Sequence, residues 1–165
     1  RSMLRRTSFG FVFQFGQLVP ELTALDNVAL PLLLNGIKRK EAYQQAKTWL
    51  NKVELASKAD SMLGELSGGQ MQRVAIARAM VVEPKILFAD EPTGSLDRLN
   101  SERVMELFIK TAKEHGTTVI MVTHEPTIAA YADREIIVRD GQISGAETAV
   151  NTSIKLGKAN AGAIK

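Results

Sequence analysis

The strongest chemical signal is a run of five residues, Leu66-Ser67-Gly68-Gly69-Gln70. Ser67 is suited to cap the N-terminus of a helix that continues to about Val82, and the two glycines leave the first turn without side chains. The N–H groups of such a turn, together with the helix dipole, favour an anion such as a phosphate. A capped helix without a ligand is the alternative, but it does not account for the complete pentapeptide.

Two carboxylates follow a run of mostly apolar residues. The segment Lys85–Ala89 predicts a strand buried on both faces, and Asp90 and Glu91 come directly after it. Ligands of open α/β sheets bind at this C-terminal edge. Asp90 suits Mg²⁺, which keeps several water ligands and takes few carboxylates, and Glu91 suits a general base acting on water. The alternative is that the two acids cap the next turn.

Two further polar residues stand at the ends of predicted strands. His124 lies just past the apolar segment Thr117–Val122, so we expect it at the same sheet edge as the carboxylates, within reach of a phosphate. Gln14 closes the segment Gly10–Gln14, where its amide could bind Mg²⁺ or position a water molecule. Taken alone, His124 is equally a histidine of a surface turn, and Gln14 indicates no function.

The spacing of apolar residues predicts the elements that position these groups. Strands are predicted at 10–14, 85–89 and 117–122, and helices at 38–53, 67–82, 101–115 and 125–131. A further helical segment opens at Thr23 and is limited by Pro31 and Gly36. Residues 135–143 predict a hairpin that turns at Asp140-Gly141. This order predicts an α/β fold with parallel strands, interrupted by a helix-rich lobe over about residues 21–82.

Composition excludes several classes of function. The 165 residues contain no cysteine, which removes disulfide scaffolds, zinc–cysteine sites and thiol catalysis. No segment approaches the roughly 20 apolar residues of a membrane helix, and no signal peptide is visible, so we expect a cytoplasmic chain. Six of the 21 basic residues lie in 1–6 and 151–165, which carry no acid, so the net charge of +3 reflects the ends. This distribution argues against nucleic acid as a partner.

Together these motifs resemble the ATP-binding cassette (ABC) ATPase family, from about Gly10 to Ile143. Gln14 resembles the Q-loop, Leu66–Gln70 the signature motif, Ile86–Glu91 the Walker B motif with its catalytic glutamate, Ser95-Leu96-Asp97 the D-loop, and His124 the switch histidine. Three segments resemble the ATPases of the branch for lipoprotein release, macrolide export and bacitracin-type peptide export: LVPELTALDNVALPLL, FADEPTGSLD and MVTHEPTIAAYADR.

The resemblance implies a partial P-loop NTPase-type parallel sheet over residues 1–145, with a helical subdomain inserted at about 21–82 and a flexible basic tail at 146–165. In this family two ATPase subunits clamp two ATP molecules head to tail. The implied contacts with ATP or the dimer interface come from Gln14, Ser67, Gly68, Gly69, Gln70 and Asp97. Asp90 and Gln14 would hold Mg²⁺, with Glu91 as the base and His124 on the γ-phosphate.

The resemblance also implies partners. The helical subdomain would dock an integral membrane permease, which places the subunit in the cytoplasm, peripheral on the inner face of the membrane, where it powers export or lipoprotein release. A non-transporting regulatory ATPase of the cell-division type is an alternative. A chromosome-maintenance or DNA-repair ATPase is disfavoured, because only 51 residues separate Gln14 from Leu66 and no sustained heptad repeat is visible.

One family motif is missing from the 165 residues. No G-x-x-x-x-G-K-[ST] segment occurs, and the lone Gly157-Lys158 pair is followed by Ala159. That motif supplies the phosphate cradle and its lysine, so we expect the printed chain to lack its own ATP site and to be inactive alone. We expect an N-terminal part of the polypeptide to precede Arg1, and an inactive truncated remnant is the alternative. The reading frame upstream of the Arg1 codon distinguishes the two.

Overall fold

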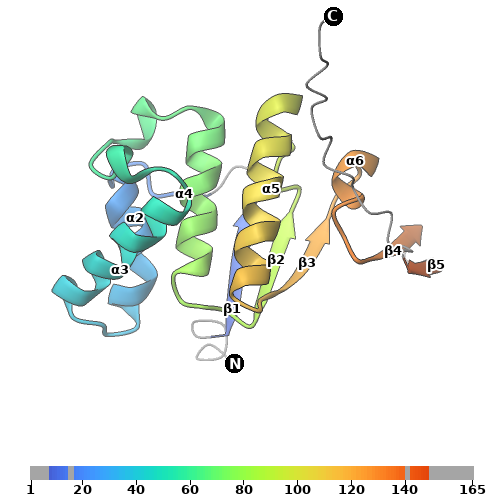
Figure 1. The fold of residues 1–165 in the computed structure, drawn as a ribbon, viewed down its shortest axis with the longest axis horizontal. Helices are drawn as coiled ribbons and strands as arrows, with labels where there is room; N and C mark the ends of the chain where they lie inside the picture. Colours follow the sequence, from blue (N-terminus) through green and yellow to red (C-terminus); the bar gives the residue numbers. More distant parts are fainter. Residues whose placement is uncertain (1–7, 15–16, 140–141, 149–165) are drawn as a thin grey trace, which may run out of the picture. The chain divides into compact units, whose positions relative to one another are not determined.

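The computed structural model describes residues 8–14, 17–139 and 142–148 (Figure 1). The chain divides into two compact units, residues 1–126 and 127–165, which are described separately below. All of the predicted site residues belong to the first unit. The prediction of one domain over residues 1–145 stays a prediction.

A three-stranded parallel sheet forms the centre of the first unit (Figure 1). Its strands are β1 (Phe9–Phe13), β2 (Ile86–Asp90) and β3 (Thr118–Val122), in the order β1-β2-β3. The register places Phe13, Asp90 and Val122 side by side at the C-terminal edge. The α/β fold with parallel strands is therefore confirmed, and each strand lies within one or two residues of its predicted range.

Helices cover one face of this sheet. Helix α4 (Gly68–Met80) contacts β1, and α5 (Arg98–Glu114) contacts β3 and α4. Beneath them the side chains of Val12, Leu87 and Ala89 are at most 2% exposed. Gly10 permits the closest approach, because a Cβ atom there would lie 2.8 Å from the carbonyl oxygen of Ala79 in α4. The core of the unit therefore lies between the sheet and these two helices.

The opposite face of the sheet is open within the part of the chain that the structure describes. Phe11, Ile120 and Val122 are 38%, 47% and 61% exposed on this face. Phe88 stacks on Phe11 with 5.4 Å between ring centroids. The prediction that the strands at 85–89 and 117–122 are buried on both faces is therefore wrong for the described residues. Side chains of a strand alternate between the two faces, and described helices cover only one of them.

The helical lobe is built from α2 (Ala24–Leu34), α3 (Arg39–Lys52) and the flank of α4, with short 3₁₀ turns at Ala56–Lys58 and Leu63–Glu65. The predicted capping box opens α2. Thr23 Oγ1 accepts from the N–H of Asp26 at 3.1 Å, and the Asp26 carboxylate accepts from the N–H of Thr23. Pro31 was predicted to limit this helix, but it lies inside it. The helix continues because the N–H of Asn35 still bonds to the Pro31 carbonyl at 3.1 Å.

The second unit contains an antiparallel hairpin. Strand β4 (Arg134–Arg139) pairs with β5 (Gln142–Thr148), and the short helix α6 (Pro126–Ala129) begins at the end of the first unit. The predicted hairpin is confirmed, while its turn at 140–141 lies outside the described residues. The predicted tail begins too early, because residues 146–148 belong to β5, and residues 149–165 lie outside the described part. Within the described ranges, no helix combines the length and apolar character needed to cross a membrane.

Candidate functional site

The C-terminal edge of the sheet gathers four of the predicted residues. Gln14 directly follows β1, Asp90 ends β2 and Glu91 follows it, and His124 lies two residues past β3. Phe13 pairs in register with Asp90, so Gln14 follows β1 at the same edge of the sheet at which β2 ends. This juxtaposition follows from the parallel sheet, in which all strand ends of one kind meet at one edge.

Glu91 and His124 are in direct contact. The carboxylate of Glu91 accepts from the backbone N–H of His124 at 3.0 Å and from Thr123 Oγ1 at 3.2 Å. Nδ1 of His124 lies 2.7 Å from the same carboxylate oxygen that the N–H contacts. The N–H of Glu91 in turn donates to the carbonyl of Val122 at 2.9 Å. The glutamate is thus fixed to the end of the neighbouring strand by four hydrogen bonds.

The backbone of Glu91 is strained in a way that produces this contact. Its φ angle is +45°, in the left-handed region that residues other than glycine rarely adopt. Such a conformation costs on the order of 1–3 kcal/mol and is found where the surrounding structure imposes it, often at functional sites. Here the turn after Asp90 directs the Glu91 side chain toward the end of β3, where it forms hydrogen bonds with Thr123 and His124.

The pair changes the protonation of the histidine. The hydrogen bond that His124 donates to Glu91, reinforced by the charge of that carboxylate, raises the pKa of His124 above its ordinary value. The His124 side chain is 81% exposed, whereas that of Glu91 is 20% exposed. Since Nδ1 is occupied by Glu91, the other ring nitrogen is the one available to an incoming ligand.

Asp90 and Gln14 carry oxygen atoms of the kinds that Mg²⁺ binds. Asp90 is exposed at the sheet edge, and the Gln14 amide lies so close to Gly94 that a Cβ atom there would be 2.8 Å from Nε2. The described ranges contain no cluster of three or more histidine, cysteine, aspartate or glutamate side chains suited to a metal. One carboxylate and one amide oxygen nevertheless suit Mg²⁺ at a phosphate site, because most of its ligands there are phosphate oxygens and water.

The pentapeptide forms the predicted helix start. Ser67 Oγ accepts from the N–H of Gln70 at 3.3 Å, and Gln70 Oε1 accepts from the N–H of Ser67 at 2.9 Å. This capping box uses Ser67 and Gln70 to close the first turn of α4. The N–H groups of Gly68 and Gly69 belong to the same turn and have no acceptor within the helix. They are the donors that an anion would meet.

Gly68 also allows a close contact that the sequence did not indicate, whereas Gly69 has only ordinary van der Waals neighbours. A Cβ atom on Gly68 would lie 3.2 Å from Leu96 Cδ2, and one on Gly69 would lie 3.6 Å from Asn100 Oδ1. Asp97, predicted at a dimer interface, caps α5, which begins three residues earlier than predicted. Hydrogen bonds from Asn100 lower the pKa of Asp97. The start of α4 therefore packs against the start of α5.

Sequence reasoning also missed three side chains that bond to the backbone beside Gln14. Gln72 Nε2 donates to the carbonyl of Phe13, Ser95 Oγ to that of Gln14, and Arg78 to that of Gln17. Gln72 and Arg78 are polar residues on an otherwise largely apolar part of α4, which was the only signal in the sequence. Their partners are about 60 residues away along the chain, so no local pattern could identify them.

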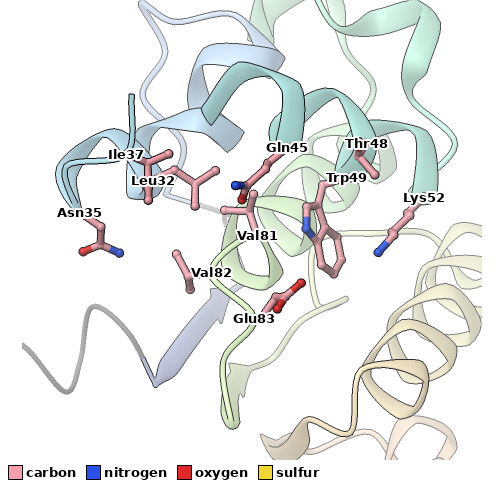
Figure 2. A pocket seen from close by; sticks show the side chains of 10 residues that line it. All are labelled: Leu32, Asn35, Ile37, Gln45, Thr48, Trp49, Lys52, Val81, Val82 and Glu83. Atoms are coloured by element: carbon pink, nitrogen blue, oxygen red, sulfur yellow. The ribbon is translucent and has the colours of Figure 1, made fainter. Parts of the chain in front are cut away.

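A cavity of about 530 Å³ lies in the helical lobe, at the end of α4 opposite Ser67 (Figure 2). Residues that line it include Leu32, Ile37, Trp49, Lys52, Val81 and Glu83. The ammonium of Lys52 lies 4.3 Å from the centre of the Trp49 ring and 3.0 Å from Nε2 of His115. His115 caps the C-terminus of α5, so this cluster joins the lobe to the rest of the first unit. The cavity has apolar walls and charged groups at its rim.

Comparison with known proteins defines the class. Residues 1–94 match the sequence model of a family described as "ABC transporter", and the chain belongs to this family. The resemblance seen in the motifs is therefore confirmed.

Individual relatives narrow the class further. The chain is 49% identical over 149 residues to the lipoprotein-releasing system ATP-binding protein LolD of Aquifex aeolicus, covering 90% of this chain and 66% of the relative. It is 52% identical to the uncharacterized ABC transporter ATP-binding protein YknY of Bacillus subtilis, covering 85% and 60%. The chain thus spans about 60–66% of the length of these relatives.

A solved structure shares the fold. The ATP-binding cassette MJ0796, in a dimeric post-hydrolysis state bound to ADP and Pi, superposes with a TM-score of 0.78 and 40% sequence identity. The match covers 91% of this chain and 66% of that one. The α/β fold with a parallel sheet is therefore that of an ABC cassette.

Proposed function

We propose that this chain is the catalytic part of an ATPase subunit that powers lipoprotein release or export by a membrane complex. One observation carries the proposal: Glu91 is held against His124 at the sheet edge that also presents Asp90 and Gln14. The relatives named for lipoprotein release and the cassette bound to ADP and Pi support the same activity. Because the chain spans about two-thirds of their length, the experiments below use the full-length polypeptide.

The chemistry follows from the geometry of the pair. Asp90 and Gln14 would hold Mg²⁺, and the bound ion would neutralise charge on the phosphate. Glu91 accepts a proton from the attacking water, and its fixed position orients that water. His124 lies on the same carboxylate through Nδ1 and presents its other ring nitrogen to the phosphate. The raised pKa of His124 favours the cation, which suits the charge that develops on the phosphoryl oxygens.

The start of α4 serves the second site of a dimer. Ser67, Gly68, Gly69 and Gln70 are proposed to contact the γ-phosphate of ATP held by a second ATPase subunit, with Asp97 at the interface. The N–H groups of the two glycines and the dipole of a 13-residue helix supply the attraction. The dimeric form of the cassette MJ0796 supports this arrangement.

The helical lobe is the proposed docking surface for an integral membrane permease, at the cavity of Figure 2. Its apolar walls suit a short amphipathic segment, while Lys52 and Glu83 offer charges of both signs. The cavity is adjacent to the C-terminus of α4, and Ser67 caps the N-terminus of the same helix. A helix is stiff along its axis, so a segment seated here can move the signature residues. The subunit is then peripheral on the cytoplasmic face of the membrane.

Replacing the base tests this function. In the full-length polypeptide, Glu91→Gln keeps the side-chain size but cannot accept the proton, so steady-state ATP hydrolysis should fall by about 10²–10⁴-fold. Glu102→Gln is the matched control, because Glu102 is exposed on α5, where it forms a surface ion pair with Arg98. Hydrolysis at the wild-type rate in Glu91→Gln would remove Glu91 as the base. Absence of hydrolysis in the wild-type polypeptide would refute the function itself.

A further inference from the structure

Three side chains from two separate segments donate to the backbone carbonyls of Phe13, Gln14 and Gln17. Gln72 Nε2 donates to Phe13 at 3.1 Å, Ser95 Oγ to Gln14 at 3.1 Å, and Arg78 Nη1 to Gln17 at 2.8 Å. We call Gln72, Ser95 and Arg78 the carbonyl clamp. The clamp holds the backbone at Gln14. It makes no bond to the Gln14 side chain, which remains available at the edge of the sheet.

Gln72 is the member with the clearest purpose. It is 3% exposed, and most of its neighbours in α4 that share its burial are apolar. A buried amide is costly unless its hydrogen bonds are made, so an apolar side chain would serve packing alone better. Among the described residues no buried side-chain nitrogen or oxygen lacks a partner. The amide is therefore explained by its contact with Phe13, the residue immediately before Gln14.

The clamp connects the start of α4 and the segment before Asp97 to the backbone at Gln14. Gln72 lies five residues after Ser67 in the same helix, about 7.5 Å along its axis. Ser95 lies two residues before Asp97, in the segment that packs against Gly68. A displacement of the start of α4 would thus reach, through the helix and the Gln72 hydrogen bond, the end of β1 at Phe13, the residue immediately before Gln14.

We propose that Gln72 is a positioning residue that couples the signature residues Ser67–Gln70 to Gln14. With α4 in place, the Gln72 amide holds the Phe13 carbonyl and with it the backbone that leads to Gln14. Ser95 supports the same backbone from the start of α5. This inference rests on the proposed function and adds to it the residue that links the two half-sites.

The test is a double-mutant cycle in the full-length polypeptide. Gln72→Met keeps the length and burial of the side chain but removes the donor. We expect kcat to fall about tenfold while the KM for ATP changes less than about twofold, because positioning rather than binding is lost. In a Gln14→Ala background the same substitution should have less than about a twofold further effect, since the group it positions is gone.

Two further variants separate positioning from stability. Thr117→Val is the matched control, because Thr117 Oγ1 also makes a buried bond to a carbonyl, that of Pro84 at 2.9 Å, near the opposite edge of the sheet. It should act independently of Gln14→Ala. Ser95→Ala replaces an exposed side chain, so it tests the clamp even if Gln72→Met fails to fold, and it should show the same non-additivity with Gln14→Ala.

The outcomes are distinct. Wild-type hydrolysis together with additive effects of Gln72→Met, or of Ser95→Ala, and Gln14→Ala would overturn the positioning role and leave the proposed function standing. A lowered kcat in Thr117→Val that is equally non-additive with Gln14→Ala would also overturn it. No hydrolysis by the wild-type polypeptide would overturn both proposals.

Discussion

Gly10→Ala tests how closely β1 approaches α4. In the structure a Cβ atom on Gly10 would lie 2.5 Å from Leu87 Cδ1, 2.8 Å from the carbonyl oxygen of Ala79 and 3.1 Å from Pro84 Cγ. The Leu87 methyl can rotate, but the Ala79 carbonyl is part of the helix backbone. Strand and helix must therefore separate by a few tenths of an ångström over a tightly packed contact.

The expected cost combines two opposing effects. Overpacking a well-packed core costs typically about 1–3 kcal/mol, and replacing glycine recovers about 0.4–1 kcal/mol from the unfolded chain. We expect a net destabilisation of about 1–2 kcal/mol, measured as a lower midpoint of urea unfolding with an unchanged m-value. Gly64→Ala is the matched control, because nothing lies within 4 Å of its added Cβ atom. It should change the free energy of unfolding by less than about 0.5 kcal/mol.

The result that would refute this reasoning is equal stability of the two variants. Gly10 would then be required by no close contact, and the packing of α4 on β1 would have to be looser than the structure shows. Because β1 leads directly to Gln14, hydrolysis by Gly10→Ala should also fall, and Gly64→Ala should not share this effect.

Two further predictions concern His124 and the cavity. The pKa of His124, followed by NMR titration, should lie above about 6.5 and fall toward it in Glu91→Gln. Since the folded-state pKa is raised, the pair stabilises the fold below pH of about 6.5, and this contribution is lost as the pH rises through the folded-state pKa; a pKa unchanged by Glu91→Gln would contradict the pairing. Thr48→Glu adds a charge at the cavity and should weaken co-purification with the permease about tenfold, equivalent to about 1.4 kcal/mol. Gln44→Glu on the exposed part of the same helix is its control, and equal losses in both would contradict docking at this cavity.

The sequence was sufficient to predict the main helices and strands and the edge of the sheet at which the polar residues meet. Asp90, Glu91 and His124 follow apolar segments of strand length, and parallel strands bring such positions together. The capping boxes at Thr23 and Ser67 were also readable, because their bonds span only three residues. These features depend on local spacing, which a single sequence records directly.

Other features depend on contacts between distant segments. The pairing of Glu91 with His124 requires the left-handed backbone at Glu91 and the register of β2 on β3, neither of which has a local signal. The bond between Gln72 and Phe13 joins residues 59 apart. The exposed face of β3 at Ile120 and Val122 was predicted to be buried, because apolar content alone does not show whether a second layer of helices is present.

In the proposed mechanism, Glu91 completes a hydrolytic site formed between two subunits. Size-exclusion chromatography of the full-length Glu91→Gln polypeptide, with and without ATP and Mg²⁺, tests it most directly. We expect a Glu91→Gln dimer that forms only with ATP and persists, while the wild-type dimer is lost as ATP is consumed. An elution position that ATP does not change, or a wild-type dimer as persistent as that of Glu91→Gln, would contradict the claim.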